Sequence, residues 1–177
     1  FIFFKSLISN IVFGIDSTLY EKGNEPLNKT KPIRIKTNPN IKSKNELSKK
    51  ILDSKATISL FTSGTTGKPK KIAHQIKSLS EQVKMGKSQV WGYTYHPSHM
   101  AGIQVFLQVI LNGFSTIFLY RAPRSIVLKS LEAYGITHIS ATPSFYRLLL
   151  PLNQPYEKVL RLTMGGEKFD SNTARRL

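Results

Sequence analysis

A short run of residues from Phe61 to Lys70 combines glycines, hydroxyl side chains and lysines, in the order Phe-Thr-Ser-Gly-Thr-Thr-Gly-Lys-Pro-Lys. Glycines allow the backbone to approach a ligand closely and to turn its N–H groups toward an anion, while hydroxyls add donors and lysine adds a point charge. Pro69 stands where a Walker A loop has Ser or Thr, so the run is not a P-loop of that type. These residue types predict a loop that holds a polyphosphate. An ordinary connection between two strands is the simpler alternative.

This run resembles, almost letter for letter, the signature of the acyl-adenylate-forming enzymes: acyl- and aryl-CoA synthetases, adenylation domains and luciferase-like proteins. Residues 96–102, 137–143 and 160–167 are similar to three further motifs of that family, in the same order and with similar spacing. Phe61 stands where tyrosine is common and Lys71 where glycine is common, and neither change removes a phosphate donor. The resemblance therefore covers most of the chain from residue 55 onward.

The resemblance implies a role for each motif. The loop would hold the β- and γ-phosphates of ATP, and Thr62 would also contribute to Mg²⁺ binding. His99 and Gly102 would line the acyl pocket, with His99 at its carboxylate end, and His99 and Lys70 would be the catalytic residues. The implied ATP-binding residues are Thr62, Ser63, Gly64, Thr65, Thr66, Gly67 and Lys70, and the residues on the adenine side are Gly165, Gly166 and Glu167.

The resemblance also implies a reaction. Members of the family convert a carboxylate into an acyl-adenylate, release pyrophosphate, and usually pass the acyl group to a thiol such as coenzyme A. Because the substrate's own carboxylate is the nucleophile, the protein has to align two anions and offset the charge of the triphosphate. We therefore expect an AMP-forming acid–thiol ligase that uses ATP, Mg²⁺ and coenzyme A. A carrier-protein thiol is the alternative acceptor, and a non-catalytic nucleotide-binding relative is the alternative to an enzyme.

The charge of the chain provides a competing hypothesis. Its 177 residues include 26 Lys and Arg against 10 Asp and Glu, which gives a formal net charge of +16. Such an excess favours anionic partners and permits a basic nucleic-acid-binding module. Most of the excess is lysine rather than arginine, however, and the segment 29–55 has no interleaved aromatic residues, which favours a nucleotide over a nucleic acid. A chain without cysteine has no disulfide or thiol nucleophile, and this fits a cytoplasmic location.

Helix and strand signals alternate along the chain and predict an α/β protein with a mostly parallel sheet built from repeated strand–helix units. The resemblance makes this sheet part of the large N-terminal domain of an adenylate-forming enzyme. The apolar run 100–120 contains polar residues and a helix stop, so we interpret it as a helix followed by a strand rather than a membrane span. The predicted strands are 11–15, 33–36, 55–61, 71–74, 90–95, 115–120, 137–142 and 160–164, and residues 16–30 are predicted to form a loop. The predicted helices cover 3–9, a segment opened by the capping box 43–46, 76–87, 99–111, 125–134, 143–150 and a segment beginning near 170.

Two further interpretations concern organisation. We expect residues 1–54 to form an N-terminal portion with a basic, linker-like segment, and residues 55–177 to form an AMP-binding domain truncated on its C-terminal side. Phe1 in place of a methionine and a helix-like pattern at Leu177 favour a piece of a longer polypeptide, with weak nucleotide binding and little turnover by itself. The neutral stripe Gln104, Gln108 and Asn112 indicates either a partly buried groove or the hydrated edge of a packing helix.

Overall fold

The computed structural model describes residues 7–8, 17–19, 43–62, 70–168 and 171–176. The chain divides into two units: the first comprises residues 1–84 and 98–100, and the second comprises residues 85–97 and 101–177. The predicted polyphosphate loop belongs to the first unit, and the predicted adenine-side turn belongs to the second.

The described part of the first unit contains a small mixed sheet with strand order β1-β2-β3, the helices α2 and α3, and two helical residues at 7–8, inside the helix predicted at 3–9. β1 pairs with β2 in parallel, and β2 pairs with β3 in an antiparallel hairpin. The Ser43 hydroxyl accepts a hydrogen bond from the Glu46 amide at 3.2 Å, which caps the first helix as its sequence predicts. The elements are β1 (Ser17–Leu19), α2 (Lys44–Leu52), β2 (Thr57–Thr62), β3 (Lys70–Gln75) and α3 (Ile76–Ser80).

Two elements of the first unit differ from their predictions. β1 lies inside the segment 16–30 that was predicted to be a loop, because its hydrogen bonds come from residues 58–60, far away in sequence. α3 ends at Ser80 instead of continuing to residue 87, since most side chains of residues 81–87 are exposed and provide no apolar stripe for a helix to bury. The strands predicted at 11–15 and 33–36 lie outside the described residues.

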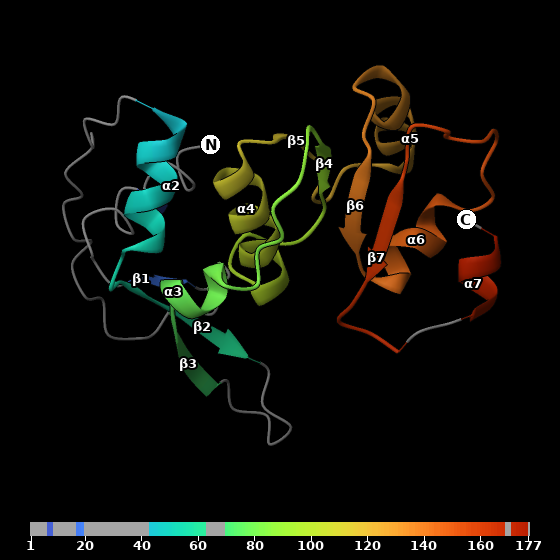
Figure 1. Cartoon of the computed structure of the whole chain (residues 1–177). Coiled ribbons are helices and arrows are strands. Elements are labelled where there is room, and N and C mark those ends of the chain that lie inside the picture. Colours follow the sequence, from blue (N-terminus) through green and yellow to red (C-terminus); the bar gives the residue numbers. More distant parts are fainter. Residues whose placement is uncertain (1–6, 9–16, 20–42, 63–69, 169–170, 177) are drawn as a thin grey trace. The chain divides into compact units, whose positions relative to one another are not determined.

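The second unit is built on a parallel sheet with strand order β5-β4-β6-β7, which confirms the predicted α/β class (Figure 1). The register aligns Phe118, Tyr93, Ser140 and Thr163 in one row across the four strands, so the carboxyl ends of all four strands lie along the same edge. The elements are β4 (Val90–Tyr93), α4 (Met100–Asn112), β5 (Ser115–Phe118), α5 (Arg124–Ala133), β6 (His138–Ala141), α6 (Pro143–Leu149), β7 (Arg161–Met164) and α7 (Ser171–Arg175).

Local signals place the boundaries of the helices in this unit. Gly135 follows the end of α5 and stops the helix. Its φ of 57° is a conformation that glycine adopts without the steric penalty of a Cβ. At the start of α6 the Thr142 hydroxyl accepts a hydrogen bond from the Phe145 amide at 3.2 Å, and Pro143 occupies the first turn. In the described part of the chain, no helix combines the length and the hydropathy that a membrane span requires.

Tyr146 anchors α6 to the sheet from inside the core. Its side chain is fully buried, and its hydroxyl lies 3.0 Å from both the Ile139 and the Thr163 carbonyl oxygens, which belong to adjacent strands. Burial raises the pKa of Tyr146 above its usual value, so the hydroxyl stays protonated and can donate. One side chain thereby holds α6, β6 and β7 together around an apolar cluster.

Tyr146→Phe tests this anchor. Removing the hydroxyl leaves two buried carbonyl oxygens short of a donor, so we expect the free energy of unfolding to fall by about 1–3 kcal/mol. Urea unfolding followed by the fluorescence of Trp91, the single tryptophan and a residue of the same unit, measures the change. Tyr134→Phe is the matched control because Tyr134 is 60% exposed, and equal losses in the two variants would contradict the assignment.

Candidate functional site

The ends of the β2–β3 hairpin present the predicted polyphosphate loop. Thr62 and Lys70 are register partners in the antiparallel pair, so residues 63–69 connect two strands whose ends are adjacent. The next pair inward is Phe61 with Lys71, and the side chains of Lys70 and Lys71 are both exposed. Five of the predicted ATP-binding residues lie outside the described residues: Ser63, Gly64, Thr65, Thr66 and Gly67.

His99 and Gly102, the predicted acyl-pocket residues, lie at and just before the start of α4. His99 directly precedes the helix and is exposed, whereas Gly102 is buried in its first turn. A Cβ on Gly102 would overlap the His96 carbonyl oxygen and would lie 2.8 Å from the Tyr93 hydroxyl. The glycine therefore permits close packing of the helix against the segment that follows β4, and its role beside an acyl group stays a prediction.

Asn112 is the last residue of the neutral stripe on α4 (Gln104, Gln108 and Asn112), and its side chain is hydrogen-bonded within the fold. Asn112 is buried, its Nδ2 donates to the Gln108 carbonyl oxygen at 2.9 Å, and its Oδ1 accepts from the Gly86 amide at 3.0 Å. These bonds tie the end of the helix to the segment before β4. For Asn112, the structure therefore supports a packing role.

A second group of polar residues gathers at the carboxyl edge of the parallel sheet, where open α/β sheets bind their ligands. The Thr94 hydroxyl donates to the Ser140 carbonyl oxygen at 2.6 Å, which joins the ends of β4 and β6. Tyr95 is buried, and its hydroxyl is hydrogen-bonded to Ser140. Burial raises the pKa of Tyr95, the hydrogen bond with Ser140 opposes the increase, and the negative charge of Glu167 adds to it, so the phenol stays neutral.

The turn after β7 is the predicted adenine-side segment. The Gly165 amide donates to the Ala141 carbonyl oxygen at 3.3 Å, and Gly166 has a φ of 85°, which disfavours any residue with a side chain. A Cβ placed on Gly165 would meet nothing within 4 Å. The backbone of this turn at Gly165 therefore borders open space.

Glu167, the third predicted residue of this turn, is bound to the start of α6. Its Oε2 accepts hydrogen bonds from the Ser144 hydroxyl at 2.6 Å and the Ser144 amide at 3.1 Å, and it forms an ion pair with Arg147 at 3.3 Å. The Ser144 hydroxyl is the main reason that the pKa of Glu167 lies below its usual value. The Ser144 amide, Thr142 and Arg147 act in the same direction, whereas desolvation opposes them.

The sequence did not single out Tyr95, Ser144 or Arg147. Tyr95 is the last residue of the strand predicted at 90–95 and lies two residues beyond the observed end of β4, whereas Ser144 and Arg147 lie in the first two turns of a predicted helix. Polar residues at the carboxyl ends of parallel strands are a usable signal for such a site. What sequence could not supply is the pairing of Ser144 with a carboxylate 23 residues away.

Aromatic and basic side chains lie at the end of β5. The rings of His96 and Tyr120 meet edge to face, with centroids 5.2 Å apart, and the Arg121 guanidinium lies 5.2 Å from the centre of the Tyr120 ring. Within the described residues, no three His, Cys, Asp or Glu side chains gather in a way that could hold a metal ion.

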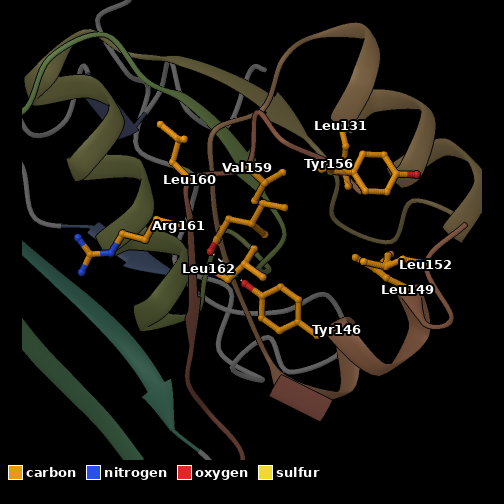
Figure 2. Close-up of a pocket in the computed structure, with 10 residues that line it drawn as sticks. Leu131, Tyr146, Leu149, Leu152, Tyr156, Val159, Leu160, Arg161 and Leu162 are labelled. Carbon is orange, nitrogen blue, oxygen red and sulfur yellow. Dashed lines mark hydrogen bonds between the residues drawn. The ribbon is translucent and has the colours of Figure 1, made fainter. Parts of the chain in front are cut away.

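The second unit also contains an apolar cavity of about 150 Å³ (Figure 2). It lies beside α6 and the amino-terminal half of β7, whereas the polar groups described above follow the carboxyl ends of the strands. The Arg161 side chain points away from it in Figure 2, and the Tyr146 hydroxyl is engaged by backbone carbonyls. Its lining is Leu131, Ile139, Tyr146, Leu149, Leu152, Tyr156, Val159, Leu160, Arg161 and Leu162. The cavity therefore lacks the converging polar groups of a ligand site.

Comparisons with known proteins identify relatives of the chain. Residues 14–177 match the family model described as AMP-binding enzyme. The chain is 30% identical over 129 residues to the 2-succinylbenzoate–CoA ligase of Staphylococcus epidermidis, a match that covers 67% of this chain and 26% of the relative. The chain thus spans about a quarter of the length of such curated relatives.

Solved structures show the same fold. O-succinylbenzoate coenzyme A synthetase from Bacillus subtilis, in complex with AMP, aligns with a TM-score of 0.53 and 25% identity over 62% of this chain and 30% of that one. The luciferase-like enzyme of the mealworm Zophobas morio aligns with a TM-score of 0.55 and 23% identity over 71% of this chain and 31% of that one.

Gly102→Ala tests the close packing at the start of α4. The added methyl group meets a backbone carbonyl that cannot rotate away, so we expect the free energy of unfolding to fall by about 1–3 kcal/mol. Gly165→Ala is the control, because the space beside Gly165 is open and the change should stay within about 0.5 kcal/mol. Urea unfolding measures both, and an undiminished stability of Gly102→Ala would refute the contact.

Ser144→Ala tests the cause of the lowered Glu167 pKa. We expect the pKa of Glu167 to rise toward its ordinary value, since the strongest donor to the carboxylate is lost. Because the pKa of Glu167 is lower in the folded state, ionised Glu167 stabilises the folded protein. This contribution is complete above the ordinary glutamate pKa of about 4.3 and is lost as the pH falls through the lowered pKa. Carboxyl NMR titration measures the shift. Ser125→Ala, at the matching second position of α5, should leave the Glu167 titration unchanged.

Proposed function

Because the chain belongs to the AMP-binding enzyme family, we propose that the protein activates a small carboxylic acid with ATP as an acyl-adenylate and transfers the acyl group to coenzyme A. The observation that carries the proposal is the match of residues 14–177 to the family, which includes the glycine- and hydroxyl-rich run between β2 and β3. The names of the relatives support the acceptor, because several are CoA ligases. A carrier-protein thiol is the alternative acceptor.

In the proposed reaction, a carboxylate oxygen of the acid attacks the α-phosphorus of ATP, and the bond from that phosphorus to the pyrophosphate oxygen breaks. The amides and hydroxyls of residues 62–67 would hold the β- and γ-phosphates, and the exposed Lys70 would add a positive charge at the base of the same loop. This role needs donors and charge rather than a protein nucleophile. His99 would lie at the carboxylate end of the acyl pocket, with Gly102 beside it.

Mg²⁺, when bound, would offset negative charge on the phosphates, with the Thr62 hydroxyl as its protein ligand and the phosphates supplying further oxygens. The residue types at the hairpin fit this ion, since Thr62 offers an oxygen ligand and its register partner Lys70 offers a cation for the remaining phosphate charge. Gly165 and Gly166 would lie against the adenine, since the space beside Gly165 is open. Tyr95 and Thr142 are polar neighbours of that turn.

We propose two further properties of the whole protein. Residues 1–54 would form an N-terminal portion that precedes the AMP-binding domain of residues 55–177, and β1 of that portion would contribute a strand to the domain's sheet. The absence of cysteine supports a cytoplasmic location.

Lys70→Ala and Lys71→Ala form a matched pair that tests the phosphate site. Both remove one exposed lysine from β3, but successive side chains of a strand point to opposite faces, so only Lys70 should serve the loop. We expect Lys70→Ala to weaken binding of Mg²⁺–ATP and of tripolyphosphate by about tenfold or more, as for loss of a charged hydrogen bond, and Lys71→Ala to weaken it less than about twofold. Isothermal titration calorimetry measures both.

The same titrations distinguish the alternatives. An equal loss of affinity for Mg²⁺–ATP in Lys70→Ala and Lys71→Ala would indicate non-specific charge attraction and would contradict a specific phosphate-binding site. Tighter binding of a DNA oligonucleotide than of ATP, with an affinity that falls steeply as salt rises, would favour the basic nucleic-acid-binding module instead. Nucleotide binding without pyrophosphate release by the full-length protein would favour a non-catalytic relative.

A further inference from the structure

The carboxylate of Glu167 closes a network between the turn after β7 and the first two turns of α6. The Ser144 amide and hydroxyl both donate to Oε2, at 3.1 and 2.6 Å. Arg147 Nη2 lies 3.3 Å from the same oxygen and donates to the Ser144 hydroxyl oxygen at 2.8 Å. Each of the three side chains therefore contacts the other two.

The network contains more contacts than a single ion pair, although the Arg147 and Glu167 side chains are 47% and 35% exposed. Single ion pairs on a protein surface contribute little, because solvent screens them and both side chains must be ordered. Here the main contacts are hydrogen bonds from a short, stiff side chain and from a backbone amide that α6 already fixes. Hydrogen bonds to a charged acceptor are also stronger than neutral ones. The position of the Glu167 side chain is thereby set by the helix.

The turn beside Glu167 has few other restraints. The Gly165 amide donates to Ala141 over a long 3.3 Å, and an added Cβ at Gly165 would meet nothing within 4 Å. Gly166 adopts a left-handed backbone conformation, and it has no side chain whose contacts could restrain the turn. Two successive glycines have more backbone freedom in the unfolded and loosened states than any other pair. The hydrogen bonds between Glu167 and Ser144 therefore link this turn to the start of α6, the helix that follows β6.

We propose that Glu167 is a positioning residue that, through Ser144 and Arg147, fixes the Gly165–Gly166 backbone relative to the start of α6 and so preorganises that backbone for a planar base. The inference rests on the proposed function and deepens it: the base contacts the glycine backbone, and Glu167 acts from behind the turn rather than as a ligand. Its Oε2 is already engaged by three donor groups, which commits this oxygen to the protein.

A rigid turn matters most for the base and least for the phosphates. Ordering a loose loop when a ligand binds costs free energy that a preorganised loop does not spend. Adenine has no charge to attract the turn, so its binding depends on the position of the backbone, whereas phosphates are attracted by lysine and amides elsewhere in the chain. We call the network of Glu167, Ser144 and Arg147 the clamp. Loss of the clamp should therefore weaken binding of AMP much more than binding of tripolyphosphate.

Three variants of the full chain test the clamp. Glu167→Ala removes every contact, Glu167→Gln keeps an oxygen that can accept from Ser144 but loses the charge, and Glu157→Ala removes an exposed carboxylate elsewhere in the same unit. Calorimetry measures binding of AMP and of tripolyphosphate. We expect AMP affinity to fall about tenfold in Glu167→Ala and about threefold in Glu167→Gln. Tripolyphosphate affinity should stay within about twofold in all three, as should AMP affinity in Glu157→Ala.

Amide hydrogen exchange provides a second readout that needs no ligand. In Glu167→Ala we expect faster exchange at Gly165 and at Ser144, with the core strands unchanged, because the clamp restrains a local opening. Unchanged exchange at both amides would overturn the clamp. Faster exchange with unchanged AMP affinity would also overturn the proposal, since it would leave Glu167 with a purely structural role.

The outcomes separate this inference from the proposed function. If the wild-type chain binds AMP and tripolyphosphate but Glu167→Ala binds AMP as tightly, the positioning role is wrong and the proposed function stands. If Glu167→Ala loses AMP and tripolyphosphate equally, Glu167 acts on the whole fold or the phosphate site, and the proposal is also wrong. If the full-length protein binds neither ligand, the proposed function fails and the positioning role fails with it.

Discussion

The parallel register of β4, β5, β6 and β7 is the constraint on which the second unit depends. Parallel strands place all their carboxyl ends along one edge, so the residues that follow each strand become neighbours although they are far apart in the sequence. Tyr95, Thr142 and Glu167 meet in this way. The interior of the unit is apolar. The buried Tyr146 hydroxyl is hydrogen-bonded there to carbonyl oxygens of two adjacent strands.

The two units differ in the groups that they present. The first ends a hairpin with Thr62 opposite Lys70, an arrangement that suits a short loop of donors and positive charge. The second has glycine backbone beside open space, next to the Glu167 carboxylate, which accepts hydrogen bonds from Ser144 and forms an ion pair with Arg147.

Glycine and glutamate have distinct functions in this chain, although both occur in the family motifs. Gly102 is required by crowding, because the His96 carbonyl oxygen occupies the place of a Cβ. Gly166 is required by its backbone angle, and Gly165 leaves space open. Glu167 carries a charge next to these glycines but directs it toward α6. A motif match alone assigns all of these residues to a ligand, whereas the contacts separate packing, conformation and positioning.

The sequence by itself determined the elements whose causes are local: the Ser43 and Thr142 caps, the stop at Gly135, the alternation of strands and helices in the second unit, and the family to which the loop between β2 and β3 points. Only the tertiary structure decided β1, whose partners lie some 40 residues away, and the contact of Ser144 with Glu167. Caps and turns satisfy hydrogen bonds within a few residues, so their residue types reveal them. Strand pairs and clamps draw their partners from distant segments, and which segments meet is set by the packing of the whole sheet.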